Sequence, residues 1–339
     1  MTYETIMGKI SSGLTGDFEQ DIDYLNKQSQ KYKEHKLAKE ILRGIGRMIF
    51  AILPEDKKAE IGRLTDNHIL GMENIVEEAE FQIGKKNFDK ALTMLEAMVN
   101  KFEKSKLYQD DSVNEYHHFN NSLELFLYSL SKPAKQIRQV QEDFVHPYVL
   151  YGFVLLELKQ YDKARNALEK ALKWNPVKVS TIFELAEIYK IEKKWEKYLE
   201  FTNICFGYVY TSQDLARCYR NLGYYYVEQK EYDLASNLYY YSLGLDKSQM
   251  AQSQLAFIFV TTGKQFSPPS VKEAQRVLES HKIPLWFNNA VIMIASNLAT
   301  NAEEVQNIDE AIFYYGILYD ITGSENILQK LQKLHKEDT

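Results

Sequence analysis

Two arginines three residues apart, Arg217 and Arg220, are the residues whose type and spacing best suit the binding of an anionic group. On a helix, side chains three positions apart share a face, so both guanidinium groups could hold one carboxylate or phosphate. The amide of Asn221 could bond to both the N–H and the C=O groups of an extended peptide. Tyr224 adds an aromatic surface for packing. This cluster indicates a binding site for a protein segment or peptide.

The remaining reactive residues form no catalytic or metal-binding pattern. The seven histidines are scattered, and the adjacent pair His117 and His118 would point about 100° apart on a helix. The sequence contains no His-Glu-x-x-His, Cys-x-x-Cys, EF-hand or Gly-x-Ser-x-Gly motif. We therefore expect a protein that is not an enzyme and that uses no cofactor and no metal.

Composition narrows the class of partner. The chain has 339 residues, of which 45% are hydrophobic, and a formal net charge of −6, which disfavours nucleic acid as a partner. Two cysteines, Cys205 and Cys218, are too few for a disulfide scaffold or a four-cysteine zinc site. A single bridge between them is possible, although buried free thiols are favoured.

Neither an export signal nor a membrane span is expected. The first 15 residues lack a basic start followed by an apolar core and a small-residue cleavage site. The longest apolar runs are far shorter than the roughly 20 residues that a bilayer helix needs. We therefore expect a soluble protein in the cytoplasm with no membrane partner.

The elements that must position the arginine cluster recur along the chain. The same sparse pattern of large and small residues occurs three times, first offset by 34 residues and then by 37, which is one period plus a three-residue insertion. Self-similarity at this period is typical of helical solenoids. The equivalent positions are Tyr148, Ile182 and Tyr219; Gly152, Ala186 and Gly223; Tyr161, Trp195 and Tyr232; and Ala164, Tyr198 and Ala235.

Each copy predicts two antiparallel helices, over about 145–158 and 161–174 in the first copy, with Pro176 blocking continuation. Small residues at Gly152 and Ala164 mark the point where the two helices approach most closely. The middle copy has Tyr198 where the small residue belongs. This predicts a locally wider helix pair or a tyrosine that points away from the crossing.

The pattern resembles the tetratricopeptide repeat. The matching residues are Tyr148, Gly152, Leu155, Tyr161, Ala164, Leu168, Ala171 and Pro176 in the first copy and Tyr219, Leu222, Gly223, Tyr226, Tyr232, Ala235 and Tyr239 in the last. The segment 215–226 is also similar to uncharacterised tetratricopeptide proteins of Gram-positive bacteria, which brings no known activity. The resemblance implies an all-α, right-handed α-solenoid of helix hairpins with an N-terminal helical module and a C-terminal capping helix.

The expected organisation follows from these copies. Residues 1–70 do not fit the period and are expected to form a helical module, with helices near 18–33, 37–53 and 55–64 and Asp17 as an N-cap. Residues 71–339 are expected to form the superhelix, with a capping box at Ser270 and Glu273. Its best repeats are 145–178, 179–212 and 216–249, its degenerate pairs are 72–105, 112–144, 250–280 and 285–322, and its cap is 325–336. Within 112–144 we expect a first helix over 112–130 and then extended chain.

The resemblance also implies which side chains line the concave groove of the array. The first helices of the three best repeats contribute His146 and Phe153, then Glu184 and Glu187, then Arg217, Arg220, Asn221 and Tyr224. Glu184 and Glu187 provide an alternative role for the arginines, because partly buried arginines are usually paired. Ligand binding and internal pairing therefore remain alternatives. Val149 and Phe153 replace the Lys and Asn of the carboxylate clamp, so acidic chaperone tails are not expected as ligands.

Two functions are compatible with this arrangement. The first is a non-enzymatic scaffold that binds a protein or peptide partner on the concave face of the superhelix. The alternative is a regulator resembling the peptide-sensing repeat proteins of Gram-positive bacteria, in which occupancy of the groove switches the N-terminal module.

Overall fold

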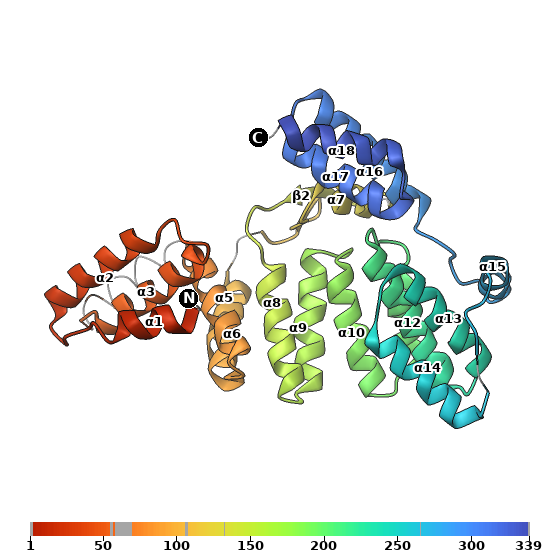
Figure 1. Cartoon of the computed structure of the whole chain (residues 1–339), viewed down its shortest axis with the longest axis horizontal. Coiled ribbons are helices and arrows are strands. Elements are labelled where there is room, and N and C mark those ends of the chain that lie inside the picture. Colours follow the sequence, from red (N-terminus) through yellow and green to blue (C-terminus); the bar gives the residue numbers. More distant parts are fainter. Residues whose placement is uncertain are drawn as a thin grey trace. The chain divides into compact units, whose positions relative to one another are not determined.

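The computed structural model describes residues 3–54, 57, 70–105, 108–131, 133–264 and 266–337. The chain is an all-α solenoid protein, as predicted, with one two-stranded sheet added to it. It divides into two compact units, Met1–Asn74 and Ile75–Thr339, which we describe separately. Figure 1 labels their helices and strands. Within the described ranges, no helix combines the length and the apolar character needed to cross a membrane.

The N-terminal unit contains helices α1 (Tyr3–Ser11), α2 (Phe18–Tyr32) and α3 (Ala38–Ile52). Both α1 and α2 pack on α3. Apolar residues at three- and four-residue spacing place one stripe of each helix in a common core. The core residues are Ile6, Ile10, Leu25, Ile41 and Ile45.

The polar residues that start α2 confirm the predicted N-cap. The Asp17 carboxylate accepts a hydrogen bond from Gln20 N at 3.0 Å. The buried Asp21 accepts from Thr15 N at 2.6 Å, and this bond holds the pKa of the Asp21 carboxyl below its ordinary value. Helix α1 was not expected. The helix predicted over 55–64 lies, except for Lys57, outside the described residues.

Helix hairpins follow one another in the second unit and stack side by side (Figure 1). They overlap the segments 72–105, 145–178, 179–212 and 216–249. The hairpins are α5 (Leu70–Gly84, which begins before the boundary between the units) with α6 (Phe88–Lys104), α8 (Val145–Glu157) with α9 (Tyr161–Trp174), α10 (Val179–Ile191) with α11 (Trp195–Cys205), and α12 (Ser212–Glu228) with α13 (Tyr232–Leu245). Helix α14 (Gln249–Thr262) then packs on α13.

Each hairpin turns at a lysine with a left-handed backbone. The φ angle is +58° at Lys86, +59° at Lys159, +56° at Lys193 and +63° at Lys230. The N–H after each lysine donates to the carbonyl five residues earlier, as Gln160 N does to Leu155 O at 2.8 Å, so a carbonyl at the helix end is satisfied. The last three lysines are 34 and 37 residues apart, as are the sequence repeats.

Small residues lie where the helices of a hairpin cross. A Cβ atom at Gly152 would lie 2.8 Å from Leu168 Cγ, and one at Gly223 would lie 3.0 Å from the ring of Tyr239. In the middle hairpin, Tyr198 is buried and its hydroxyl donates to Asn221 O of α12 at 2.9 Å. The tyrosine therefore points away from its own crossing and towards the next helix, which was one of the two predicted outcomes.

The helix pair expected over 112–144 is replaced by a strand-helix-strand insert. It consists of β1 (Asn114–His117), α7 (Ser122–Ser129) and β2 (Gln136–Gln139), with β1 and β2 paired in parallel. The helix expected from residue 112 begins at Ser122 because the Asn121 side chain caps it, accepting from Glu124 N at 3.0 Å. The histidine pair 117–118 therefore lies at the end of a strand and not on a helix.

A buried polar network attaches this insert to the array. The Glu124 side chain is 2% exposed and accepts hydrogen bonds from Asn120 N at 2.8 Å and from the Asn175 side chain at 2.7 Å. Lys178 lies 3.6 Å from the same carboxylate. A buried charge is tolerated only when it is paired and hydrogen-bonded, so these contacts fix α7 against the loop between α9 and α10.

The four C-terminal helices are α15 (Val271–Ser280), α16 (Asn289–Glu304), α17 (Ile308–Thr322) and α18 (Glu325–Glu337). Helix α15 packs on α13, whereas α16, α17 and α18 lie at the edge of the array where the insert is attached (Figure 1). The predicted capping box at Ser270 and Glu273 is present. Helix α16 packs on α7, and one core joins Leu123 of α7, Val209 of the loop before α12, and Leu331 of α18.

The segment 325–336 was expected to cap the end of the solenoid, but the structure places it elsewhere. Helix α18 packs on α17, and its Leu331 and Leu334 are buried in the core shared with α7. Contacts to the array include Ser212 N at the start of α12 with Asp320 Oδ2 of α17 at 2.6 Å, and Tyr219 OH of α12 with Pro284 O of the loop before α16 at 2.8 Å. The pair α16–α17 is thus a hairpin that lies beside the array and does not extend it (Figure 1).

A carboxylate at the end of α16 gives the C-terminal helices a pH dependence. Glu303 accepts from Lys330 Nζ at 2.8 Å and from Tyr315 OH at 2.6 Å, and these bonds hold its pKa below the ordinary 4.5. The resulting stabilisation is present above pH 4.5 and is lost as pH falls through the lowered pKa. We expect Glu303→Gln to unfold at lower urea at neutral pH and to lose less stability than the parent on acidification to about pH 3. Equal losses would contradict this role of Glu303.

Candidate functional site

The predicted groove residues lie on the first helices of three consecutive hairpins. His146 and Phe153 are on α8, Glu184 and Glu187 on α10, and Arg217, Arg220, Asn221 and Tyr224 on α12. Five of these side chains, all on α10 or α12, are half-buried, and we call the surface that they form the inner face. It comprises Glu184, Glu187, Arg217, Asn221 and Tyr224.

Arg217 is held by α10. Its Nη2 atom donates to Glu184 Oε1 at 3.2 Å, and its guanidinium group lies 4.4 Å from the centre of the Phe183 ring. The side chains of Arg217 and Glu184 are 35% and 29% exposed. An ion pair this accessible to water is weak, about 0–1 kcal/mol, so a ligand can replace either partner at small cost.

Arg220 does not join Arg217 on a shared acceptor. Its side chain is 10% exposed, and Nη1 donates to Asp246 Oδ2 at 2.9 Å. Asp246 is the residue at which α13 ends. The two guanidinium groups are therefore not placed to hold one anion, contrary to expectation. Arg220 fixes the end of α13, and Arg217 is the only one of the two arginines in the inner face.

Glu187, Asn221 and Tyr224 complete the inner face. Glu187 pairs with Lys190 at 2.5 Å, and the Lys190 ammonium lies 5.0 Å from the centre of the Tyr224 ring. Burial, together with the nearby Glu228 carboxylate, raises the pKa of Tyr224, so its hydroxyl stays protonated at neutral pH. The half-buried Asn221 side chain makes no hydrogen bond to any described residue.

The two groove residues of α8 are directed towards the preceding hairpin. His146 Nε2 lies 2.9 Å from Glu80 Oε1 of α5. Phe153 packs edge-on against Phe88 of α6, with ring centres 6.5 Å apart. Both side chains thereby join α8 to α5 and α6, and they are not part of the inner face.

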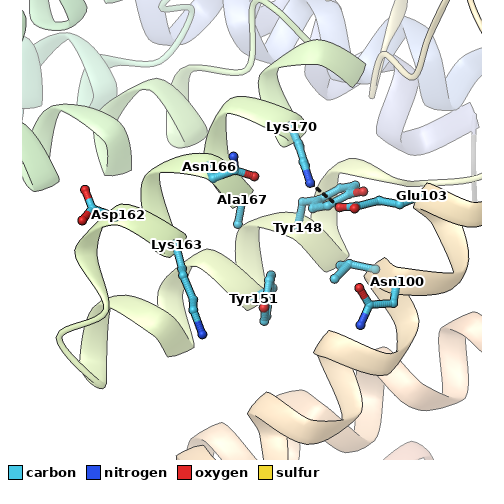
Figure 2. A pocket seen from close by; sticks show the side chains of 10 residues that line it. Asn100, Glu103, Tyr148, Tyr151, Asp162, Lys163, Asn166, Ala167 and Lys170 are labelled. Atoms are coloured by element: carbon cyan, nitrogen blue, oxygen red, sulfur yellow. Dashed lines mark hydrogen bonds and ion pairs between the residues drawn. The ribbon is translucent and has the colours of Figure 1, made fainter.

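A surface cavity that sequence reasoning missed lies between α6 and α9, with α8 as its floor. Its volume is about 340 Å³. Figure 2 shows Tyr148 and Tyr151 on the floor and the ion pair of Lys170 with Glu103 across one end. Burial and the Glu96 carboxylate raise the pKa of Tyr151 to about 12. We call this cavity the α6–α9 furrow.

Some polar groups of the furrow already have hydrogen-bond partners. Tyr151 OH donates to Glu96, and Lys170 is occupied by Glu103. Asn100 and Asn166 are exposed on its two sides and bond to no described side chain or backbone group. These residues lie on second helices of hairpins, at positions that carried no signal in the repeat pattern.

The metal-ligating and thiol side chains of the described residues were predicted to be dispersed or buried. No group of three or more His, Cys, Asp or Glu side chains there is placed to hold a metal ion. Cys205 and Cys218 are free and fully buried, as favoured from the sequence. Burial beside Cys205 raises the pKa of the Cys218 thiol.

Comparison with known families identifies the central hairpin. A family model described as tetratricopeptide repeat matches residues 145–178. These residues are a tetratricopeptide repeat. The repeat comprises α8, α9 and the turn that leads into α10, so it directly precedes the inner face. No match was found among curated proteins.

Several solved structures resemble the tetratricopeptide array at low identity. A tetratricopeptide repeat protein from Parabacteroides merdae is 11% identical, with 98% of each chain covered and a TM-score of 0.40. PilF of Pseudomonas aeruginosa is 12% identical, with 77% of this chain and 96% of that chain covered and a TM-score of 0.40. YrrB, described as a tetratricopeptide protein with an unusual peptide-binding site, is 13% identical, with 62% and 99% covered and a TM-score of 0.30.

Proposed function

We propose that this protein is a non-enzymatic scaffold that binds a segment of a partner protein across the inner face of α10 and α12. The observation that carries the proposal is the half-buried Asn221 amide, which has no partner among the described residues and lies between Arg217 and Tyr224. An amide in that position can donate to and accept from the backbone of an extended segment. Stacked hairpins supply a preformed surface, so the partner carries most of the ordering cost.

The charges of the inner face define the segment it suits. Opening the half-exposed pair of Arg217 and Glu184 frees one guanidinium and one carboxylate at adjacent positions. A segment with an acidic and a basic side chain close together would replace both partners of that pair at once. The Tyr224 ring, with Lys190 on one side, offers a place for an apolar or aromatic side chain of the ligand.

Titration of a selected peptide tests the proposal. A random 12-residue peptide library is panned on the whole protein, and the enriched peptide is titrated calorimetrically against variants. We expect Asn221→Ala and Tyr224→Ala each to raise the Kd by at least about tenfold, as loss of a central contact does. Asn166→Ala, which removes an exposed amide of the furrow, is the matched control and should leave the Kd unchanged. Loss of affinity in the control alone would instead assign binding to the furrow.

One observation favours a second candidate function. The first 74 residues form a compact unit with its own core, as a module switched by occupancy of the inner face would require. If the protein is a peptide-sensing regulator, the selected peptide should change its radius of gyration, measured by X-ray scattering. If it is a simple scaffold, the radius of gyration should stay the same.

A further inference from the structure

Helix α14 is the first helix of a hairpin whose second helix is missing. In the preceding hairpin, α13 covers Gly223 of α12 through the ring of Tyr239. The equivalent position of α14 is Ala256, which is exposed. The next helix, α15, packs on α13. The face of α14 that a partner helix would cover is therefore open to solvent.

That open face is apolar and lies opposite the buried face of the helix. Ala251 and Ile258 are fully buried against the core of α13. The face around Ala256 exposes 79% of Val260 and 50% of Phe259, and Phe257, which borders it, is also 50% exposed. Contiguous exposure of large apolar side chains is unusual for a surface that stays in water.

The absence of charge on α14 favours a second copy of the chain over a charged partner. Helix α14 contains no charged residue in its sequence QMAQSQLAFIFVTT, although 26% of the chain is charged and its net charge is −6. Two identical negatively charged chains can approach through this helix without placing like charges opposite each other. A basic or acidic partner would gain no ion pair from it.

The order of side chains along α14 is self-complementary. Ala256 lies at the middle of the helix, flanked by small and polar residues towards its start and by large apolar ones towards its end. If two copies pack antiparallel about a two-fold axis at Ala256, Phe259 of one faces Ser253 of the other, and Val260 faces Gln252. Each large side chain then lies opposite a smaller or more flexible one. Ala256, which is small, lies where the two helices cross.

We propose that the protein forms a two-fold symmetric dimer in which α14 of each copy takes the place of the missing second helix of the other. The occupant of the open face is thus a second copy of this chain. The dimer joins two arrays end to end and leaves the inner faces of α10 and α12 free in both copies.

Sedimentation velocity over about 1–100 µM, the range that resolves moderate affinities, tests the dimer directly. We expect the parent to dimerise and Val260→Glu to weaken dimerisation by at least about 100-fold, because two carboxylates would be buried without partners. Met293→Glu is the matched control, since Met293 is 65% exposed on α16, which packs on α7 and α17. It should dimerise like the parent. A parent that is monomeric throughout, or a Val260→Glu variant that still dimerises, would overturn the proposal.

A cysteine at the proposed axis gives a second, position-specific measurement. Ala256→Cys would place each thiol beside its copy, so copper-phenanthroline oxidation should give a disulfide-linked dimer. Met293→Cys should stay monomeric on a non-reducing gel. The native Cys205 and Cys218 are fully buried and should not react. Equal cross-linking of both variants, or of neither, would exclude an antiparallel pair centred on Ala256.

Discussion

Replacing Arg220 with alanine should lower the free energy of unfolding by about 3 kcal/mol, whereas Arg217→Ala should change it by no more than about 1 kcal/mol. The Arg220 side chain is 10% exposed and bonds to Asp246, itself 22% exposed, so its removal leaves a poorly hydrated carboxylate without a counter-ion. Arg217 and Glu184 are each about a third exposed, and water replaces the lost contact.

Urea unfolding followed by circular dichroism measures both changes on the same scale. Arg220→Met is a useful companion, because it keeps most of the side-chain volume while removing the charge. We expect it also to be destabilising, since Asp246 again loses its partner. Similar losses for Arg217→Ala and Arg220→Ala would mean that the two arginines do not differ in role.

Replacing Gly223 with valine should lower the free energy of unfolding by about 3 kcal/mol, at the upper end of what overpacking usually costs. A Cβ atom there would already lie within 3.0–3.2 Å of three atoms of the fully buried Tyr239 ring, and the added methyl groups of valine have no free space. Because Gly223 sets the distance between α12 and α13, the hairpin must open to admit the new side chain.

Gly244→Val is the matched control for this prediction. Gly244 lies near the end of α13, and a Cβ atom there would meet nothing within 4 Å. Its replacement should change stability by less than about 1 kcal/mol, which is the scale of helix propensity alone. Equal destabilisation by the two valines in thermal unfolding would show that close approach at Gly223 does not hold the hairpin together.

The array could be predicted because its physical requirements repeat. Every hairpin needs a small residue at its crossing and a chain reversal after its first helix, so Gly152, Gly223 and the lysine turns recur with the same offsets. The fold class follows from that periodicity. The departure at Tyr198 was also informative, since a large side chain at a crossing must either widen the helix pair or point away from it, and Tyr198 points away.

The insert and the C-terminal helices could not be placed, because their positions depend on single long-range contacts. Nothing local indicates that Glu124 and Asn175 meet, or that α16 packs on α7 and not after α14. The same applies to Arg220, whose partner Asp246 lies 26 residues later at a helix end. Repeat positions predict which face a residue occupies, but they do not predict which neighbour it bonds to.

Photo-cross-linking of the selected peptide tests most directly whether the inner face is the binding surface. The peptide carries a benzophenone side chain, is irradiated with the whole protein, and the modified residues are mapped by mass spectrometry. We predict adducts on α10 and α12, centred on the residues around Asn221 and Tyr224. Adducts confined to α6 and α9, around Asn100 and Asn166, would contradict the account and place binding in the α6–α9 furrow.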